Sequence, residues 1–175
     1  MVKKNNIFIG MSLTESYKNK LQRLAGIIEN QSRGINNPYI FDNPKLIKMI
    51  EKAIEPSSFI CTYVASAVKM LTGDNVKIYG FSSEENPESE YFFDEGSDEG
   101  HHFAVMNNRY IIDPWIYDNF IDGKTLNRSV FDLQNKKDEK IIRYLYGDKN
   151  KWTDITDRVK DFKELFPKTY RNIII

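Results

Sequence analysis

The segment Gly100-His-His-Phe-Ala-Val-Met-Asn-Asn-Arg-Tyr-Ile-Ile-Asp-Pro-Trp115 joins two apolar runs through a pair of asparagines. Asparagine tolerates the positive backbone φ angles that tight hairpin turns require. The segment is therefore expected to form a β-hairpin, with strands over 101–106 and 109–113. Its two-residue turn would consist of Asn107 and Asn108.

The length of this turn determines which side chains face each other. A two-residue turn pairs Met106 with Arg109, and the same register places His102 opposite Asp113. Paired side chains lie about 5 Å apart, within reach of a hydrogen bond between a carboxylate and an imidazole. Asp113 would then fix the tautomer of His102 and leave its other ring nitrogen available. A three-residue loop at 106–108 would instead place His101 opposite Asp113.

A helix is expected upstream of the hairpin, around the cysteine. Apolar residues recur with helical spacing from Cys61 to Leu71, and Gly73 suits the position just after a helix end. Ser57 or Ser58 would cap this helix, which places Cys61 in its first turn. Free backbone amides at a helix start favour a thiolate, and they can also stabilise an oxyanion.

Few residues in the chain can support thiol chemistry. The sequence holds one cysteine and two adjacent histidines, so a thiol nucleophile must be Cys61 and its base His101 or His102. An internal disulfide and a metal site with several cysteines are excluded. Adjacent strand residues point to opposite faces, so a metal site built on both histidines is disfavoured and no cofactor is expected. The simpler alternative is a buried structural cysteine beside an ordinary hairpin.

These two segments resemble the papain-like and transglutaminase-like superfamily of cysteine hydrolases. Cys61-Thr-Tyr-Val-Ala-Ser-Ala-Val is similar to that superfamily's nucleophile helix. His102-Phe-Ala-Val, followed by Arg-Tyr-Ile-Ile-Asp113-Pro-Trp, is similar to its histidine strand, short turn and aspartate strand. The resemblance covers roughly residues 57–116. It implies that Cys61 is the nucleophile, His102 the base and Asp113 the group that orients the base.

The sequence departs from the papain-type pattern just before the cysteine. Papain-type proteases carry a glutamine there as an oxyanion donor, whereas this chain reads Glu55-Pro56-Ser57-Ser58. The second oxyanion donor is therefore unassigned. An aspartate as third member of the triad is typical of transglutaminase-like enzymes and of bacterial effector deamidases or proteases.

Hydrophobic periodicity predicts the remaining elements. They are helices over 12–30, 43–55 and from Thr153 or Asp154 to Pro167, with strands over 76–81 and 140–146. Helices come first and antiparallel strands later, which indicates an α+β fold with N-terminal helices packed on an antiparallel sheet. We expect a single domain over 1–175, because the length suits one core.

Composition limits the partners and the location. Lysine plus arginine and aspartate plus glutamate both number 25, so no net charge favours nucleic acid. No apolar run approaches the ~20 residues of a membrane span, and the patch at 7–9 is too short for a Sec signal. The protein is expected to be cytoplasmic as synthesised, or exported by a non-Sec route as a bacterial effector would be. Its oligomeric state is not indicated.

An acidic segment precedes the hairpin. Residues 82–100 contain eight acids and no lysine, arginine or histidine. The simpler interpretation is a solvated mobile loop, and the functional one is a flap over the cleft that favours basic substrates.

Two function hypotheses follow from these patterns. The first is a thiol-dependent amide hydrolase or acyl transferase, either a protease or a protein-glutamine deamidase or transglutaminase. It would act on a protein or peptide substrate through Cys61, His102 and Asp113. The alternative is a non-catalytic binding module, of effector or immunity type, on the same scaffold.

Overall fold

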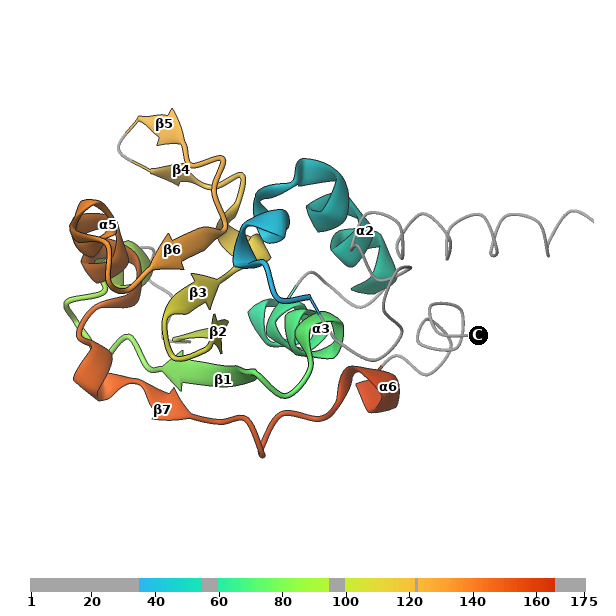
Figure 1. The fold of residues 1–175 in the computed structure, drawn as a ribbon. Coiled ribbons are helices and arrows are strands. Elements are labelled where there is room, and N and C mark those ends of the chain that lie inside the picture. Colours follow the sequence, from blue (N-terminus) through green and yellow to red (C-terminus); the bar gives the residue numbers. More distant parts are fainter. Residues whose placement is uncertain (1–34, 55–59, 95–99, 122, 166–175) are drawn as a thin grey trace, which may run out of the picture.

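The computed structural model describes residues 35–54, 60–94, 100–121 and 123–165. Its centre is a five-stranded antiparallel sheet (Figure 1). In spatial order the strands are β6 (Val130–Asp132), β3 (Tyr110–Ile112), β2 (His101–Met106), β1 (Val76–Phe81) and β7 (Thr153–Asp154). A separate two-stranded sheet pairs β4 (Phe120–Ile121) with β5 (Lys124–Thr125).

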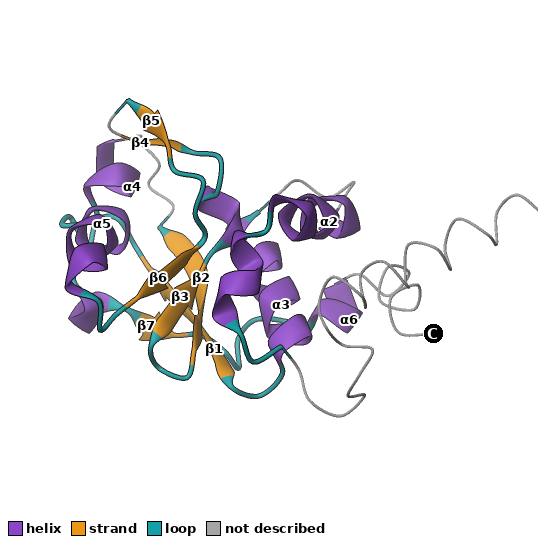
Figure 2. Ribbon diagram, turned by 45° about the horizontal axis from the view of Figure 1, so that its top comes forward, coloured by secondary structure: helices purple, strands orange, loops and turns teal. Residues whose placement is uncertain are grey.

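Helices cover both faces of the large sheet. The helices are α2 (Pro44–Ile54), α3 (Cys61–Thr72), α4 (Glu90–Asp94), α5 (Lys136–Tyr146) and α6 (Phe162–Leu165). Short 3-10 turns are η2 (Pro38–Asp42), η3 (Pro114–Ile116) and η4 (Lys149–Lys151). Helices α2 and α3 lie on one side of the sheet, and α4 and α5 lie on the other (Figures 1 and 2). The α+β class with an antiparallel sheet is thereby confirmed.

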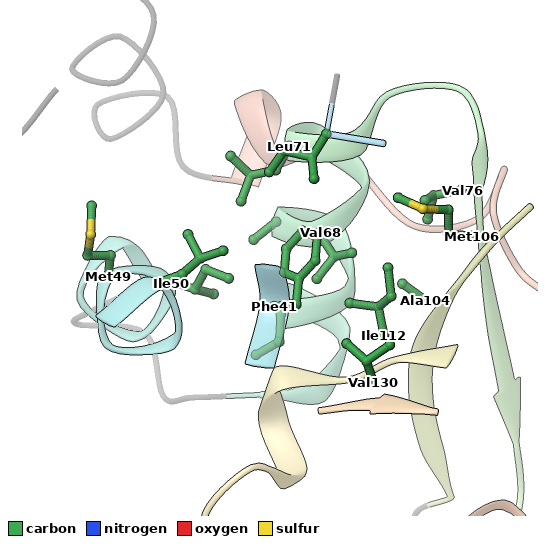
Figure 3. Packing of buried hydrophobic residues seen from close by; sticks show 14 of the residues in the cluster. Phe41, Met49, Ile50, Val68, Leu71, Val76, Ala104, Met106, Ile112 and Val130 are labelled. Atoms are coloured by element: carbon green, nitrogen blue, oxygen red, sulfur yellow. The ribbon is translucent and has the colours of Figure 1, made fainter. Parts of the chain in front are cut away.

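The α3 side of the sheet is an aliphatic core. Val68 of α3 is fully buried against alternate residues of β1 and β2, and Phe41 fills the space toward α2 (Figure 3). The small residues Ala65 and Ala67 are also buried in α3, and α3 contacts both β1 and β2. This packing holds the start of α3 beside the start of β2, because the helix cannot slide without opening the core.

The α5 side of the sheet is aromatic and partly polar. Its buried core contains Phe81, Phe103, Phe131 and Tyr146, together with aliphatic residues of β3 and α5. His101 and Asp113 are buried on this same side, and their side chains are only 1% and 2% exposed. A polar pair in such surroundings must satisfy its hydrogen bonds internally.

The hairpin forms, but its predicted register is wrong by one residue. Asn107 and Asn108 adopt φ angles of 54° and 53°, as the turn prediction requires. However, Met106 pairs with Tyr110, so the loop contains three residues and Arg109 stays outside the ladder. His102 therefore does not lie opposite Asp113.

Arg109 is held outside the ladder by strand β6. Its guanidinium donates from Nε and from one Nη to the two carboxylate oxygens of Asp132, at 2.9 and 2.7 Å. Its carbonyl accepts from the backbone N–H of Leu133 at 2.9 Å. An extra residue of this kind is a β-bulge, and it moves every later side chain to the other face.

Two other predicted elements are wrong. Residues 140–146 belong to helix α5, because Asn135 caps its start and Asp138 and Glu139 lie in its first turn. Residues Thr153 and Asp154 form strand β7 beside β1 and do not cap the last helix, which is limited to Phe162–Leu165. The predicted helix over 12–30 lies outside the described residues.

The acidic segment is more ordered than a solvated loop. Asn86 and Ser89 are fully buried, and their side chains donate to the carbonyls of Tyr146 and Leu145 at 3.0 and 2.7 Å. Glu90–Asp94 then form α4, whose Phe92 packs against His101. This part of the segment is fixed on α5, whereas residues 95–99 lie outside the described chain.

Candidate active site

Cys61 is the first residue of α3, as expected from its place in the sequence. The preceding residue, Ile60, is the N-cap and provides no side-chain hydrogen bond, and the predicted capping residues Ser57 and Ser58 lie outside the described residues. The backbone N–H groups of Tyr63 and Val64 both donate to the Ile60 carbonyl. The first amides of a helix have no acceptor within it. The amide of Cys61 thus lies next to its own partly buried thiol.

His101, and not His102, is the histidine bound to Asp113. The Nε2–H of His101 donates to Oδ2 of Asp113 at 2.6 Å, and both side chains are buried. The one-residue bulge explains this outcome, because it places His101 and Asp113 on the same face of the sheet. With Nε2 engaged by the carboxylate, Nδ1 is the ring nitrogen that remains for another partner.

Tyr146 also hydrogen-bonds Asp113. Its hydroxyl donates to the same Oδ2 of Asp113 at 3.0 Å, and the tyrosine is fully buried at the end of α5. Burial, together with the neighbouring carboxylate, raises the pKa of Tyr146 well above its ordinary value, so the phenol stays protonated and donates. Asp113 thus receives two hydrogen bonds from two separate elements.

Aromatic rings enclose the imidazole of His101. Phe92 stacks on it with ring centroids 4.3 Å apart and an angle of 17° between the planes. Trp115 lies 5.0 Å away, and Tyr146 and Phe103 complete the surroundings at 6.2 Å each. These rings exclude water from the bond between His101 and Asp113, which strengthens the electrostatic interaction.

The two imidazoles of β2 change the acidity of the Cys61 thiol. Burial by itself would raise the pKa of Cys61, but hydrogen bonds with the side chains of His101 and His102 outweigh it and lower the pKa to about 6. Burial would likewise lower the pKa of His101, but the charge and hydrogen bond of Asp113 and the contact with Cys61 raise it to about 9. Between these values the pair exists as thiolate and imidazolium.

His102 points to the opposite side of the sheet. Its Nδ1 lies 2.6 Å from the hydroxyl oxygen of Thr62, the second residue of α3. Its ring lies over Gly80, the residue paired with it in β1, where a Cβ atom would be only 2.9 Å from Nε2. The predicted contact between His102 and Asp113 is therefore wrong, although His102 still contacts Cys61 from the other side.

Cys61 opens onto a cleft of about 520 Å³. The cleft lies between the start of α3, the end of β1, the start of β2, and β7 with the segment that follows it. It is lined by Ile60, Cys61, Thr62, Gly80, Phe81, Ser82, Glu85, Gly100, His102, Thr153, Ile155 and Arg158. His101 and Asp113 are not among the lining residues. A second cavity of about 540 Å³ lies beside α5 and does not include Cys61.

Neither metal ligands nor a membrane helix are found in the described ranges. Within them, no three histidine, cysteine, aspartate or glutamate side chains are grouped so as to hold a metal ion. None of the helices in the same ranges is both long and apolar enough to cross a bilayer.

Three comparisons with known proteins give no match to this chain, whether by family models, curated sequences or solved structures. The fold and the site define an α+β protein in which a buried, hydrogen-bonded histidine–aspartate pair accompanies a cysteine at the start of a helix.

Proposed function

We propose that the protein is a cysteine-dependent acyl-transfer enzyme that hydrolyses or transfers an amide-type carbonyl group. Cys61 is the nucleophile, His101 the base and later the acid, and Asp113 orients the histidine. The observation that carries the proposal is the buried pair in which His101 donates to Asp113 at 2.6 Å, together with the cleft-lining Cys61, whose pKa the two neighbouring imidazoles lower to about 6. A nucleophile, a base and a group that orients the base are the components of nucleophilic catalysis.

The reaction would begin with the thiolate already formed. The Cys61 sulfur attacks the substrate carbonyl carbon, a C–S bond forms, and the C=O pair of electrons moves onto oxygen. The imidazolium of His101 then gives its Nδ1 proton to the leaving amine as the C–N bond breaks. An incoming water or amine loses a proton to His101, attacks the thioester and releases Cys61 as the thiolate.

The surroundings of each group suit its proposed role. Cys61 is partly exposed in the cleft, where a substrate can reach it, whereas Asp113 is covered by Tyr146 and the aromatic rings. The carboxylate cannot exchange His101 for water, so the imidazole is kept in one tautomer and orientation. The amide of Cys61 at the start of α3 supplies one donor for the developing oxyanion.

The same observations support a papain-like or transglutaminase-like scaffold. The nucleophile begins a helix that packs on an antiparallel sheet, the histidine begins β2, and the aspartate directly follows β3, the second strand of the same hairpin. On this scaffold the substrate would be a protein or peptide, attacked either at a peptide bond or at a glutamine side chain.

Trapping the acyl-enzyme tests the proposal. The protein is incubated with p-nitrophenyl acetate, and its mass is measured before and after the burst of p-nitrophenol. We expect one acetyl group per chain, attached at Cys61, and none in Cys61→Ser. No acetylation of the folded protein, with Cys61 alkylated only after denaturation, would overturn the proposal and favour a binding module.

A further inference from the structure

Cys61 contacts two imidazoles, although acyl transfer requires only one base. His101 is on the α5 side of the sheet with Asp113, and His102 is on the α3 side, where it lines the cleft. His102 and Cys61 line the same cleft, and His102 helps to lower the pKa of the thiol. His102 is thus placed at the point where a substrate carbonyl would meet the thiolate.

The hydroxyl of Thr62 hydrogen-bonds one ring nitrogen of His102. It lies 2.6 Å from Nδ1, and within the described ranges this is the one hydrogen bond made by the Thr62 side chain. If the hydroxyl proton is given to Nδ1, the ring proton resides on Nε2. His102 then has a donor, and no lone pair, at its other nitrogen.

Among the described residues no carboxylate forms an ion pair with His102, whereas Asp113 pairs with His101. A Cβ built on Gly80 of β1 would meet both the His102 ring and Ile155, which follows β7. The glycine leaves room for the ring, because a Cβ there would lie 2.4 Å from its Cδ2. Without a carboxylate comparable to Asp113, His102 is equipped to donate a hydrogen bond and not to act as the base.

We propose that His102 is the second oxyanion donor of the site, with Thr62 as its positioning residue. The inference rests on the proposed function, since an oxyanion forms only if Cys61 attacks a carbonyl. As the C–S bond forms, the carbonyl oxygen gains the electron pair and accepts hydrogen bonds from the Cys61 amide and from Nε2–H of His102. No proton is transferred, and the bonds weaken again when the leaving group departs.

This assignment provides the donor that the sequence leaves open. Residues 55–58 contain no glutamine, and Ile60 contributes no polar side chain to the helix start. A donor from β2 lies instead beside the start of α3, so the two donors come from different elements. A fixed pair of donors stabilises the developing charge without reorganisation during the reaction.

Two reagents distinguish an oxyanion donor from a general effect on the thiol. Iodoacetamide alkylates sulfur at a saturated carbon and forms no oxyanion, whereas p-nitrophenyl acetate is attacked at a carbonyl. The ratio of the acetylation rate to the alkylation rate cancels the fraction of thiolate, so it reports on the carbonyl oxygen alone. We measure this ratio at one pH for the wild type and for each variant.

The expected result is a selective loss of acetylation. His102→Ala should lower the ratio by about 100-fold, the usual effect of removing one oxyanion donor. His102→Gln, whose amide can donate, should recover part of the loss. A ratio within about two-fold of the wild type in His102→Ala would overturn the assignment, even when the wild type itself is readily acetylated. A wild type that is alkylated slowly and never acetylated would instead refute the proposed function.

Thr62 provides a second test in case His102→Ala does not fold. Thr62→Val has nearly the same shape but no hydroxyl, so Nε2 of His102 is no longer held protonated. We expect the ratio to fall by about ten-fold, with recovery in Thr62→Ser. A ratio that falls equally in Thr62→Ser and Thr62→Val would show that packing, and not the hydroxyl, is responsible, and it would overturn the role of Thr62.

Discussion

The two histidines of β2 are neighbours in sequence but occupy opposite environments. His101 is 1% exposed, stacked on Phe92 and bound to a carboxylate. His102 is partly exposed, lies over a glycine and is bound to a hydroxyl. The environment of each imidazole, and not its residue type, therefore separates a base from a hydrogen-bond donor.

Replacement of the buried histidine should have the largest effect. His101→Ala removes the proton acceptor and the charge that stabilises the thiolate, so acetylation by p-nitrophenyl acetate should fall by about 1,000-fold or more. His102→Ala should cost about ten times less, because the base remains. The measurement is the burst rate of p-nitrophenol at pH 7.5. Equal losses in the two variants would erase the distinction between the two sites.

Replacement of the carboxylate should come next. Asp113→Asn keeps the size of the side chain but provides no negative charge for the imidazolium. Its amide can also turn its NH2 group, a donor, toward His101 where an acceptor is needed. Acetylation should fall by about 100-fold or more, and the pKa of His101 should drop from about 9. The matched control is Asp154→Asn, an exposed aspartate of β7 whose partner is Lys77. Similar losses in both variants would contradict the role of Asp113.

Removal of the Tyr146 hydroxyl tests how much this group stabilises the buried pair of His101 and Asp113. Tyr146→Phe deletes one hydrogen bond to a buried carboxylate, and such bonds contribute about 1.5–3 kcal/mol. We expect the free energy of unfolding to fall by this amount in urea titrations, with a smaller loss of acetylation. Tyr144→Phe on the same helix, where the ring is only partly buried, is the comparison variant. An unchanged unfolding free energy in Tyr146→Phe would show that the hydroxyl does not stabilise Asp113.

The smallest effect is expected from a change on the cleft side of the site, next to His102. Gly80→Ala would place a Cβ 2.4 Å from Cδ2 of His102, so the ring must move while His101 stays in place. The acetylation-to-alkylation ratio should fall by about ten-fold or less, and the alkylation rate should stay close to the wild type. A variant that instead slows both reactions equally would mean that the two histidines are not independent.

Much of the fold follows from local patterns in the sequence. Val76–Phe81 alternates as a strand should, and the helix ending at Gly73 has the expected glycine with φ of +79°. The apolar residues of 140–146 favour a strand, whereas Asn135 and the acids after it favour a helix start, and the helix start prevails. Strand β7 has only two residues and exists through its pairing with β1, which local sequence does not encode.

The candidate site was predictable in part. Cys61 and Asp113 could be identified from their types and positions, and they lie where a helix start and a strand end were expected. The choice of histidine depends on one bulged residue, Arg109, which is held by Asp132 from a distant strand. Tyr146 lies 33 residues after Asp113 along the chain, and no local sequence pattern predicts the contact between them.

The pH dependence of Cys61 alkylation tests the central claim most directly. Hydrogen bonds to the two imidazoles lower the pKa of the thiol, so the rate with iodoacetamide should rise through a midpoint near pH 6 and then level off. In His101→Ala the thiol loses its charged partner, and the midpoint should move toward the ordinary value of about 8.5. A wild-type midpoint near 8.5, unchanged in His101→Ala, would contradict the existence of a thiolate–imidazolium pair.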